Sequence, residues 1–208
     1  MKQILDLNSW ARKEHFHFFS QFEEPFFGLT VNIDCTIAYA AAKEKGTSFF
    51  LHYLHKSLTA ANRVPAFRYR IVEGQVWIYD QVDASPTIDR PDGTFGFSYL
   101  VYQEDYLEFK AGADLEIGQV RNSTSLFPAK LGECVIHYSA LPWISFSSLS
   151  HARSFSFQDS SPKISFGKIT EQDGKKTMPV SIHVHHALVD GLQVGQFMEC
   201  FQQLMNEK

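Results

Sequence analysis

The sequence predicts an α/β (α+β) two-layer sandwich, in which helices cover a single mixed, largely antiparallel sheet. Segments with the alternating pattern of strands are interspersed with segments of helical periodicity along the whole chain. Two strand pairs are separated by the short turns Glu73-Gly74 and Asp173-Gly174, which are typical of antiparallel hairpins. No internal repeat or long linker divides the 208 residues, so we expect one domain, residues 1–208.

The elements of the first half follow from hydrophobic spacing and from start and stop residues. Asn8 or Ser9 is expected to cap a short helix within 8–22, and Gly46 to end a helix over 37–45. Thr47 is expected to cap the next helix, with His52 and His55 on its surface. Strands are predicted over 26–36 and, as a hairpin, over 66–80.

The second half continues the same mixture. Ser85-Pro86 and Pro91-Asp92-Gly93 are interpreted as turns, and the serine-rich residues 145–161 as a mobile loop. The remaining predictions are strands over 94–102 and 132–138, a helix over 104–121, a hairpin of strands over 163–169 and 177–184, and a helix over 192–207.

Composition excludes several classes of function. Hydrophobic residues make up 44% and charged residues 20% of the chain, the balance of a globular protein. The net charge of -4, without a long basic run, indicates neither nucleic acid nor an anionic membrane as a partner. We expect a cytoplasmic protein, because there is no secretory leader or membrane-spanning stretch. The cysteines, Cys35, Cys134 and Cys200, form no CxxC pair, so no metal is expected.

The strand over 178–184 leads directly into His185-His186-Ala187-Leu188-Val189-Asp190-Gly191, and a helix follows. The imidazole of His186 can take a proton from an alcohol or thiol near neutral pH and return it later. Asp190 can cap the helix, fix the turn or pair with a distant cation. An alternative interpretation is a polar strand end with a common Asp-Gly turn. Arg12 lies among apolar residues, so its guanidinium should need a carboxylate partner.

Six segments in order resemble the chloramphenicol acetyltransferase family, nearly from end to end of the chain. They are Trp10-Ala11-Arg12-Lys13-Glu14-His15-Phe16, Asn32-Ile33-Asp34-Cys35-Thr36, Thr94-Phe95, Leu126-Phe127-Pro128, Ser139-Ala140-Leu141-Pro142-Trp143 and the His185–Gly191 motif.

The resemblance implies a coenzyme-A-dependent acyltransferase fold assembled as a homotrimer, with active sites at the subunit interfaces. It implies acetyl-CoA as the donor, a hydroxyl of chloramphenicol or a related small molecule as the acceptor, no metal, and a role in antibiotic resistance.

The resemblance also implies roles for individual residues. His186 would be the general base, held in one tautomer by a bond to its own backbone carbonyl, and Ser139 would donate to the oxyanion. Arg12 and Asp190 would form a buried salt bridge, and Ser165 would position a water. The acceptor pocket would be aromatic, formed by Phe18, Phe19, Phe95, Phe97 and Phe127. Lys168 is a candidate contact for the CoA phosphates, whereas His185, Cys35 and Cys200 are interpreted as structural.

The predicted pocket residues differ from those of the family more than the predicted catalytic residues do. Phe19 stands where the family often has tyrosine, and Glu23 stands where the family has an apolar residue. Phe97 replaces a small residue, and Leu149-Ser150-His151 stands where an aromatic and an aliphatic residue usually line the site. An altered acceptor is therefore one alternative, and a non-catalytic trimer is another. The same motif occurs in the acyltransferase cores of 2-oxo acid dehydrogenase complexes, normally preceded by a lipoyl domain, and in condensation domains of about twice this length.

Overall fold

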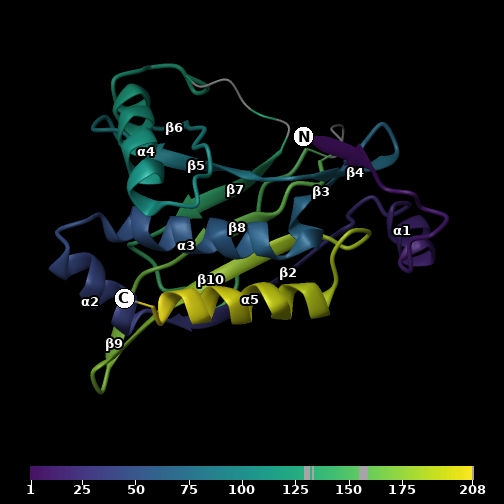
Figure 1. The fold of residues 1–208 in the computed structure, drawn as a ribbon. Helices are drawn as coiled ribbons and strands as arrows, with labels where there is room; N and C mark the ends of the chain where they lie inside the picture. Colours follow the sequence, from purple (N-terminus) through teal and green to yellow (C-terminus); the bar gives the residue numbers. More distant parts are fainter. Residues whose placement is uncertain (129–131, 133, 155–158, 208) are drawn as a thin grey trace.

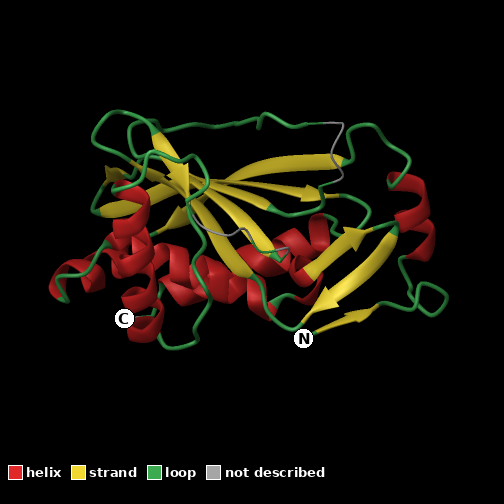
Figure 2. Cartoon of the chain, turned by 90° about the horizontal axis from the view of Figure 1, so that it is seen from above, coloured by secondary structure: helices red, strands yellow, loops and turns green. Residues whose placement is uncertain are grey.

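The computed structural model describes all residues except 129–131, 133, 155–158 and 208. Its main feature is a seven-stranded mixed sheet (Figures 1 and 2), which confirms the predicted fold class. The order is β2 (Phe26–Asp34), β10 (Lys175–His185), β8 (Lys163–Phe166), β7 (Val135–Ala140), β5 (Asp83–Asp89) and β6 (Phe95–Phe97), and β9 (Thr170–Gln172) also pairs with β10. The ladders β8–β7 and β7–β5 are parallel and the others are antiparallel.

Two long helices, α3 (Phe49–Arg63) and α5 (Gly191–Met205), lie side by side over one face of this sheet (Figure 1). The fully buried ring of Phe166 on β8 lies 4.6 Å from the ring of Tyr53 on α3 and 6.2 Å from that of Phe201 on α5. Burying a phenylalanine contributes roughly 2 kcal/mol. The helices are therefore held to the sheet by its apolar face.

The other helices lie nearer the ends of the molecule. They are α1 (Lys13–Phe19), α2 (Thr36–Glu44) and α4 (Tyr106–Arg121). A second, small sheet has the order β1 (Lys2–Ile4), β4 (Gln75–Tyr79) and β3 (Tyr69–Val72), with a 3-10 turn over Pro65–Arg68 before it. Glu73 and Gly74 both have positive φ, as a two-residue hairpin turn requires, and so do Asp173 and Gly174. Both predicted hairpin turns are confirmed.

Two predicted helix caps were wrong by a few residues. The helix predicted within 8–22 begins only at Lys13, and its N-cap residue, Arg12, makes no side-chain capping hydrogen bond to α1. In α3 the cap is Ser48 rather than Thr47, because its Oγ accepts from the N–H of Leu51.

The interpretation of Ser85-Pro86 as a turn was wrong, because both residues lie inside β5. Pro86 lies opposite Tyr138 in the parallel ladder with β7, and its carbonyl accepts from the N–H of Ser98. The strand predicted over 94–102 is reduced to Phe95–Phe97, with an isolated bridge between Ala84 and Leu100.

The prediction that His52 and His55 lie on a helix surface was also wrong. Both are buried, with exposed fractions of 6% and 8%. Tyr106 of α4 packs edge-on against both rings, and Nε2 of His55 lies 2.9 Å from the carbonyl oxygen of Gln103. The helix that carries both histidines, α3, is therefore covered on two sides, by the sheet and by the region around α4.

The serine-rich segment 145–161 is irregular but held in place where it is described; residues 155–158 lie outside the described residues. The ring of His151 packs edge-on against His183 at 4.8 Å, and Ser160 Oγ accepts from the N–H of Ile71 at 2.8 Å. Ser161 is buried as well.

The buried histidines predict a loss of stability in mild acid. Burial lowers the pKa of His52 and of His185 to about 4, against about 6.5 in the unfolded chain. Between these values the unfolded chain binds protons that the folded chain does not, so stability is complete above pH 6.5 and falls below it. We expect the free energy of unfolding to fall by roughly 1 kcal/mol for each of the two histidines between pH 6.5 and 5.5.

Urea unfolding at fixed protein concentration tests this expectation. The carboxyl groups do not interfere in that range, because the pKa values of Asp34, Asp159 and Asp190 are lowered below 3.8. A free energy of unfolding that stays constant from pH 7 to pH 5.5 would contradict the assignment of neutral buried histidines.

Candidate active site

The backbone of His186 is held on both sides directly after β10 ends. Its N–H donates to the carbonyl of Pro25 at 2.8 Å, and its carbonyl accepts from Nη2 of Arg12 at 3.1 Å. The neighbouring His185 completes the turn, since its Nδ1 accepts from the N–H of Ala187 at 3.3 Å. The backbone of His186 is therefore fixed by Pro25 just before β2, by Arg12 and by the turn itself.

The imidazole of His186 is positioned by aromatic rings. It stacks on Phe19 with a centroid distance of 3.8 Å and an interplanar angle of 14°, and the ring of Phe27 lies 4.6 Å away. The expected bond from the ring to its own carbonyl is absent: Nδ1 is buried without a hydrogen-bond partner among the described residues, and the carbonyl is bound by Arg12 instead. That expectation was wrong.

Asp190 fills all three roles that the sequence left open. Its Oδ1 accepts from the N–H of Leu192 at 2.9 Å and so caps α5, and its own N–H donates to Oε1 of Gln193. Its Oδ2 forms an ion pair with Nη1 of Arg12, which confirms the expected salt bridge. Burial raises the pKa of Asp190, but the bonds from Leu192 and Arg12 outweigh this effect and lower it. The carboxylate therefore stays charged.

A row of hydroxyl groups crosses the sheet on the face away from the helices. Ser139 on β7 lies opposite Ser165 on β8, which lies opposite Ser181 on β10. Residues directly opposite one another point to the same face of a sheet, and the adjacent Tyr138 points to the helices, with its Oη 3.2 Å from Ser57 Oγ. Ser165 Oγ is fully buried and has no hydrogen-bond partner within the described part of the chain.

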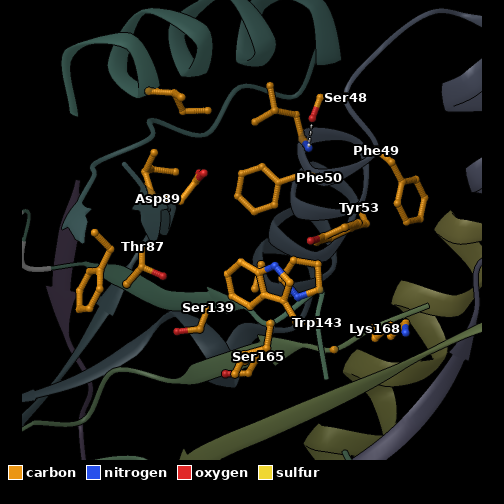
Figure 3. Close-up of a pocket in the computed structure, with 18 of the residues that line it drawn as sticks. Ser48, Phe49, Phe50, Tyr53, Thr87, Asp89, Ser139, Trp143, Ser165 and Lys168 are labelled. Atoms are coloured by element: carbon orange, nitrogen blue, oxygen red, sulfur yellow. Dashed lines mark hydrogen bonds between the residues drawn. The ribbon is translucent and has the colours of Figure 1, made fainter. Parts of the chain in front are cut away.

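A cavity of about 1270 Å³ opens where β7 and β8 end (Figure 3). Ser139 and Ser165 lie next to each other in its wall, and the ring of Trp143, 74% exposed, lies beside them. Further lining comes from α3, from the end of β5, from β6 and from the segments after β7 and β8. It includes Phe49, Tyr53, Thr87, Arg90, Phe95, His151 and Lys168. The polar groups in this wall can bind to a ligand as donors or acceptors.

Three cations line the cavity, and among the described residues two of them have their side-chain donors bound. Arg90 donates to the carbonyls of Val120, Phe95 and Ser125, and Arg121 pairs with Asp89. Lys168 is exposed and has no ion pair among the described residues. It is therefore the cation best placed to meet an anionic group of a ligand.

One chain does not bring the predicted catalytic pair together. Ser139 lies level with Ser181, and His185 is four residues further along β10. At ~3.3 Å per residue and ~4.8 Å between strands, His186 is separated from Ser139 by at least roughly 15 Å. His186 is also not among the residues that line the cavity.

The residues predicted to form the acceptor pocket are also separated, into two clusters at opposite ends of the molecule. Phe18 and Phe19 contact each other beside His186, at the end of the molecule where α1 lies. Phe97 stacks on Phe127 at 5.0 Å and contacts Phe95 at the opposite end, near β6 (Figure 1). Within a single chain these residues therefore form two separate clusters.

Sequence reasoning did not select several residues of the site. Thr87 and Arg90 were missed because β5 was not recognised as a strand, and Tyr53 was interpreted only as part of a helix. Among the described residues, no group of three histidine, cysteine or acidic side chains could hold a metal, and no helix is long and apolar enough to cross a membrane.

Comparison with known proteins gives consistent matches over nearly the whole chain. A family model described as chloramphenicol acetyltransferase matches residues 2–202. A chloramphenicol acetyltransferase of Proteus mirabilis is 30% identical over 205 residues, covering 98% of this chain and 94% of that protein. Chloramphenicol acetyltransferase 2 of Haemophilus influenzae is 29% identical, covering 96% and 95%. A solved chloramphenicol acetyltransferase structure superposes with a TM-score of 0.91 at 33% identity, covering 99% of this chain and 100% of that chain.

More distant structures share only the fold. The dihydrolipoamide acetyltransferase of Azotobacter vinelandii has a TM-score of 0.66 at 19% identity, covering 93% of this chain and 86% of that chain. This likeness shows a shared fold and carries no activity over to this chain.

The Arg12 contacts predict the effect of removing its side chain. We expect Arg12→Ala to lower the free energy of unfolding by about 2 kcal/mol, because the Asp190 carboxylate and the His186 carbonyl both lose a charged donor. His15→Ala, at an exposed position of α1, is the control and should change it by less than about 0.5 kcal/mol. Equal urea midpoints for the two variants would show that the ion pair does not hold this turn.

Proposed function

The chain belongs to the chloramphenicol acetyltransferase family, and from this membership we propose that it is an acetyl-CoA-dependent O-acetyltransferase. The acceptor is a hydroxyl of chloramphenicol or of a related small molecule. The observation that carries the proposal is the pair of half-sites: a histidine held rigidly at a strand end, and a cavity with a hydroxyl pair in its wall. Each half supplies what direct acetyl transfer needs and the other lacks.

In the proposed reaction, His186 takes the proton of the acceptor hydroxyl while the hydroxyl oxygen attacks the carbonyl carbon of the thioester. The carbonyl oxygen becomes an oxyanion, to which the Ser139 hydroxyl donates. One such donor contributes ~3 kcal/mol to lowering the barrier, or about 100-fold in rate. The tetrahedral intermediate then breaks its carbon–sulfur bond, and the CoA thiolate recovers the proton from His186.

The proposal requires a neighbouring copy of the chain. We infer a homotrimer in which His186 of one subunit faces the cavity of the next, so that the distance of roughly 15 Å within one chain is bridged between chains. Large exposed apolar side chains at both half-sites support this arrangement. They are Phe18, Phe22, Phe95, Phe127, Trp143 and Ile144.

The donor and the acceptor would enter from different sides. The cavity is large enough for the acetyl-bearing arm of acetyl-CoA, and the exposed Lys168 is suited to its phosphates. The buried hydroxyl of Ser165, which lacks a protein partner within the described part of the chain, is suited to a water or to the acyl group. The aromatic clusters Phe18–Phe19 and Phe95–Phe97–Phe127 would enclose the acceptor.

The identity of the acceptor is the second part of the proposal. Phe97 occupies space against Phe127, and the exposed Glu23 follows the Phe18–Phe19–Phe22 aromatic cluster, so a hydroxylated compound other than chloramphenicol is the second candidate. A non-catalytic trimer is less favoured because the Arg12–Asp190 pair still orients His186. We further propose one domain over residues 1–208, a cytoplasmic location and a role in antibiotic resistance.

Release of CoA thiol tests the function. We expect the protein to release thiol from acetyl-CoA in the presence of chloramphenicol or of another alcohol in an acceptor panel. His186→Ala should lose the activity completely but keep its fold and assembly, because only the proton acceptor is removed. The exposed His15→Ala is the matched control and should keep full turnover. Full turnover by His186→Ala would refute the mechanism.

A further inference from the structure

An ion pair outside the histidine motif lies at the start of β2, the strand that pairs with the end of β10 before His186. Arg153, in the irregular segment before residues 155–158, pairs through Nη1 with Oε1 of Glu24. The arginine side chain is only 11% exposed, whereas that of Glu24 is 47% exposed. A guanidinium withdrawn from water in this way depends on its carboxylate partner.

The carboxylate of Glu24 also binds the backbone at the start of β2. The same Oε1 that meets Arg153 also accepts from the N–H of Phe26 at 3.0 Å, so the carboxylate closes the turn that begins β2. Pro25 lies inside that turn, and its carbonyl accepts the N–H of His186 at 2.8 Å. A displacement of the turn would therefore move the backbone of His186 directly.

Arg153 makes its second contact with the ring of Phe26. The guanidinium carbon of Arg153 lies 3.7 Å from the centroid of this ring, and Lys163 Nζ lies 4.6 Å from it. The ring packs edge-on against His185 at 5.4 Å. Arg153 thus lies over the strand end from which both histidines of the motif project.

The charge of Arg153 also affects His185. The groups that face this imidazole are Arg153, Lys163, Asp159 and His186. Burial is the largest cause that lowers the pKa of His185, and the nearby positive charge of Arg153 adds to it. A neutral ring is required here, because Nδ1 can accept from the N–H of Ala187 only while it is unprotonated.

We propose that Arg153 and Glu24 are positioning residues for acetyl transfer: their ion pair fixes the Glu24–Phe26 turn and thereby the backbone of His186. The inference rests on the proposed function, since it assigns these residues to the geometry of the general base. Neither residue contacts the reacting atoms. Their removal should therefore reduce turnover without changing the binding of the donor.

The test compares steady-state kinetics of Glu24→Gln, Arg153→Met, Arg153→Lys and the double variant Glu24→Gln/Arg153→Met. Glutamine keeps an oxygen for the N–H of Phe26 but removes the charge. We expect kcat to fall about tenfold in Glu24→Gln and in Arg153→Met, with KM for acetyl-CoA within about twofold of wild type. Arg153→Lys should recover most of the loss, and the double variant should be no worse than either single variant.

The pH dependence provides a readout that loss of folded protein would not change. In Arg153→Met the acidic limb of kcat should move to higher pH, since His185 then protonates more readily. The matched control is Glu171→Gln, which breaks an ion pair with Lys176 on the distant β9–β10 hairpin and should leave kcat unchanged. Rates are normalised to folded protein, and Glu24→Gln alone decides the outcome if Arg153→Met does not fold.

Two results would overturn the inference. One is a kcat within twofold of wild type in Glu24→Gln and in every folded Arg153 variant, and the other is losses that multiply in the double variant. Failure of the proposed function itself is distinguishable, because wild-type protein would then release no thiol or His186→Ala would remain active.

Discussion

The turn that carries His186 is held first by the Arg12 guanidinium. It joins the start of α1 to the carboxylate that caps α5 and to the carbonyl of His186. A planar guanidinium with several fixed donors can meet two acceptors at once, which an ammonium group does less well. The helix cap, the turn and the histidine backbone therefore share one electrostatic anchor, and Phe19 on the same short helix stacks on the imidazole.

The register of the sheet sets the second constraint. Strand pairing places Ser139, Ser165 and Ser181 in one row, with apolar side chains on the helix side and hydroxyls on the other. The same register places His186 at the far end of β10, and backbone hydrogen bonds do not allow this distance to close within a chain. Catalysis by this pair of side chains therefore requires a second copy of the chain. One face of the sheet packs against the helices, and the opposite face together with the strand end carries the residues of the proposed reaction.

Much of the site could be predicted because its signals are local. The His185–Gly191 motif lies at a strand–helix junction, and a lone arginine among apolar residues requires a carboxylate. These local signals selected Arg12 and Asp190, whereas their pairing, which the structure confirms, was implied only by the family resemblance. The errors arose where contacts between distant parts of the chain decide the secondary structure or the burial of a residue. Pro86 is tolerated in β5 because the residues before it in the strand pair with β7. His52 and His55 are buried because the region around α4 covers a second side of α3. The link from Arg153 through Glu24 to His186 joins residues distant in sequence, and no local pattern indicates it.

The most direct measurement of the central claim is subunit complementation. Equal amounts of His186→Ala and Ser139→Ala chains are unfolded together, refolded and assayed for thiol release from acetyl-CoA. If His186 of one subunit works with Ser139 of the next, three quarters of randomly assembled trimers contain both variants, and each of these has one intact site. The account predicts about a quarter of wild-type activity, well above either variant refolded alone. A mixture no more active than its two components would contradict it.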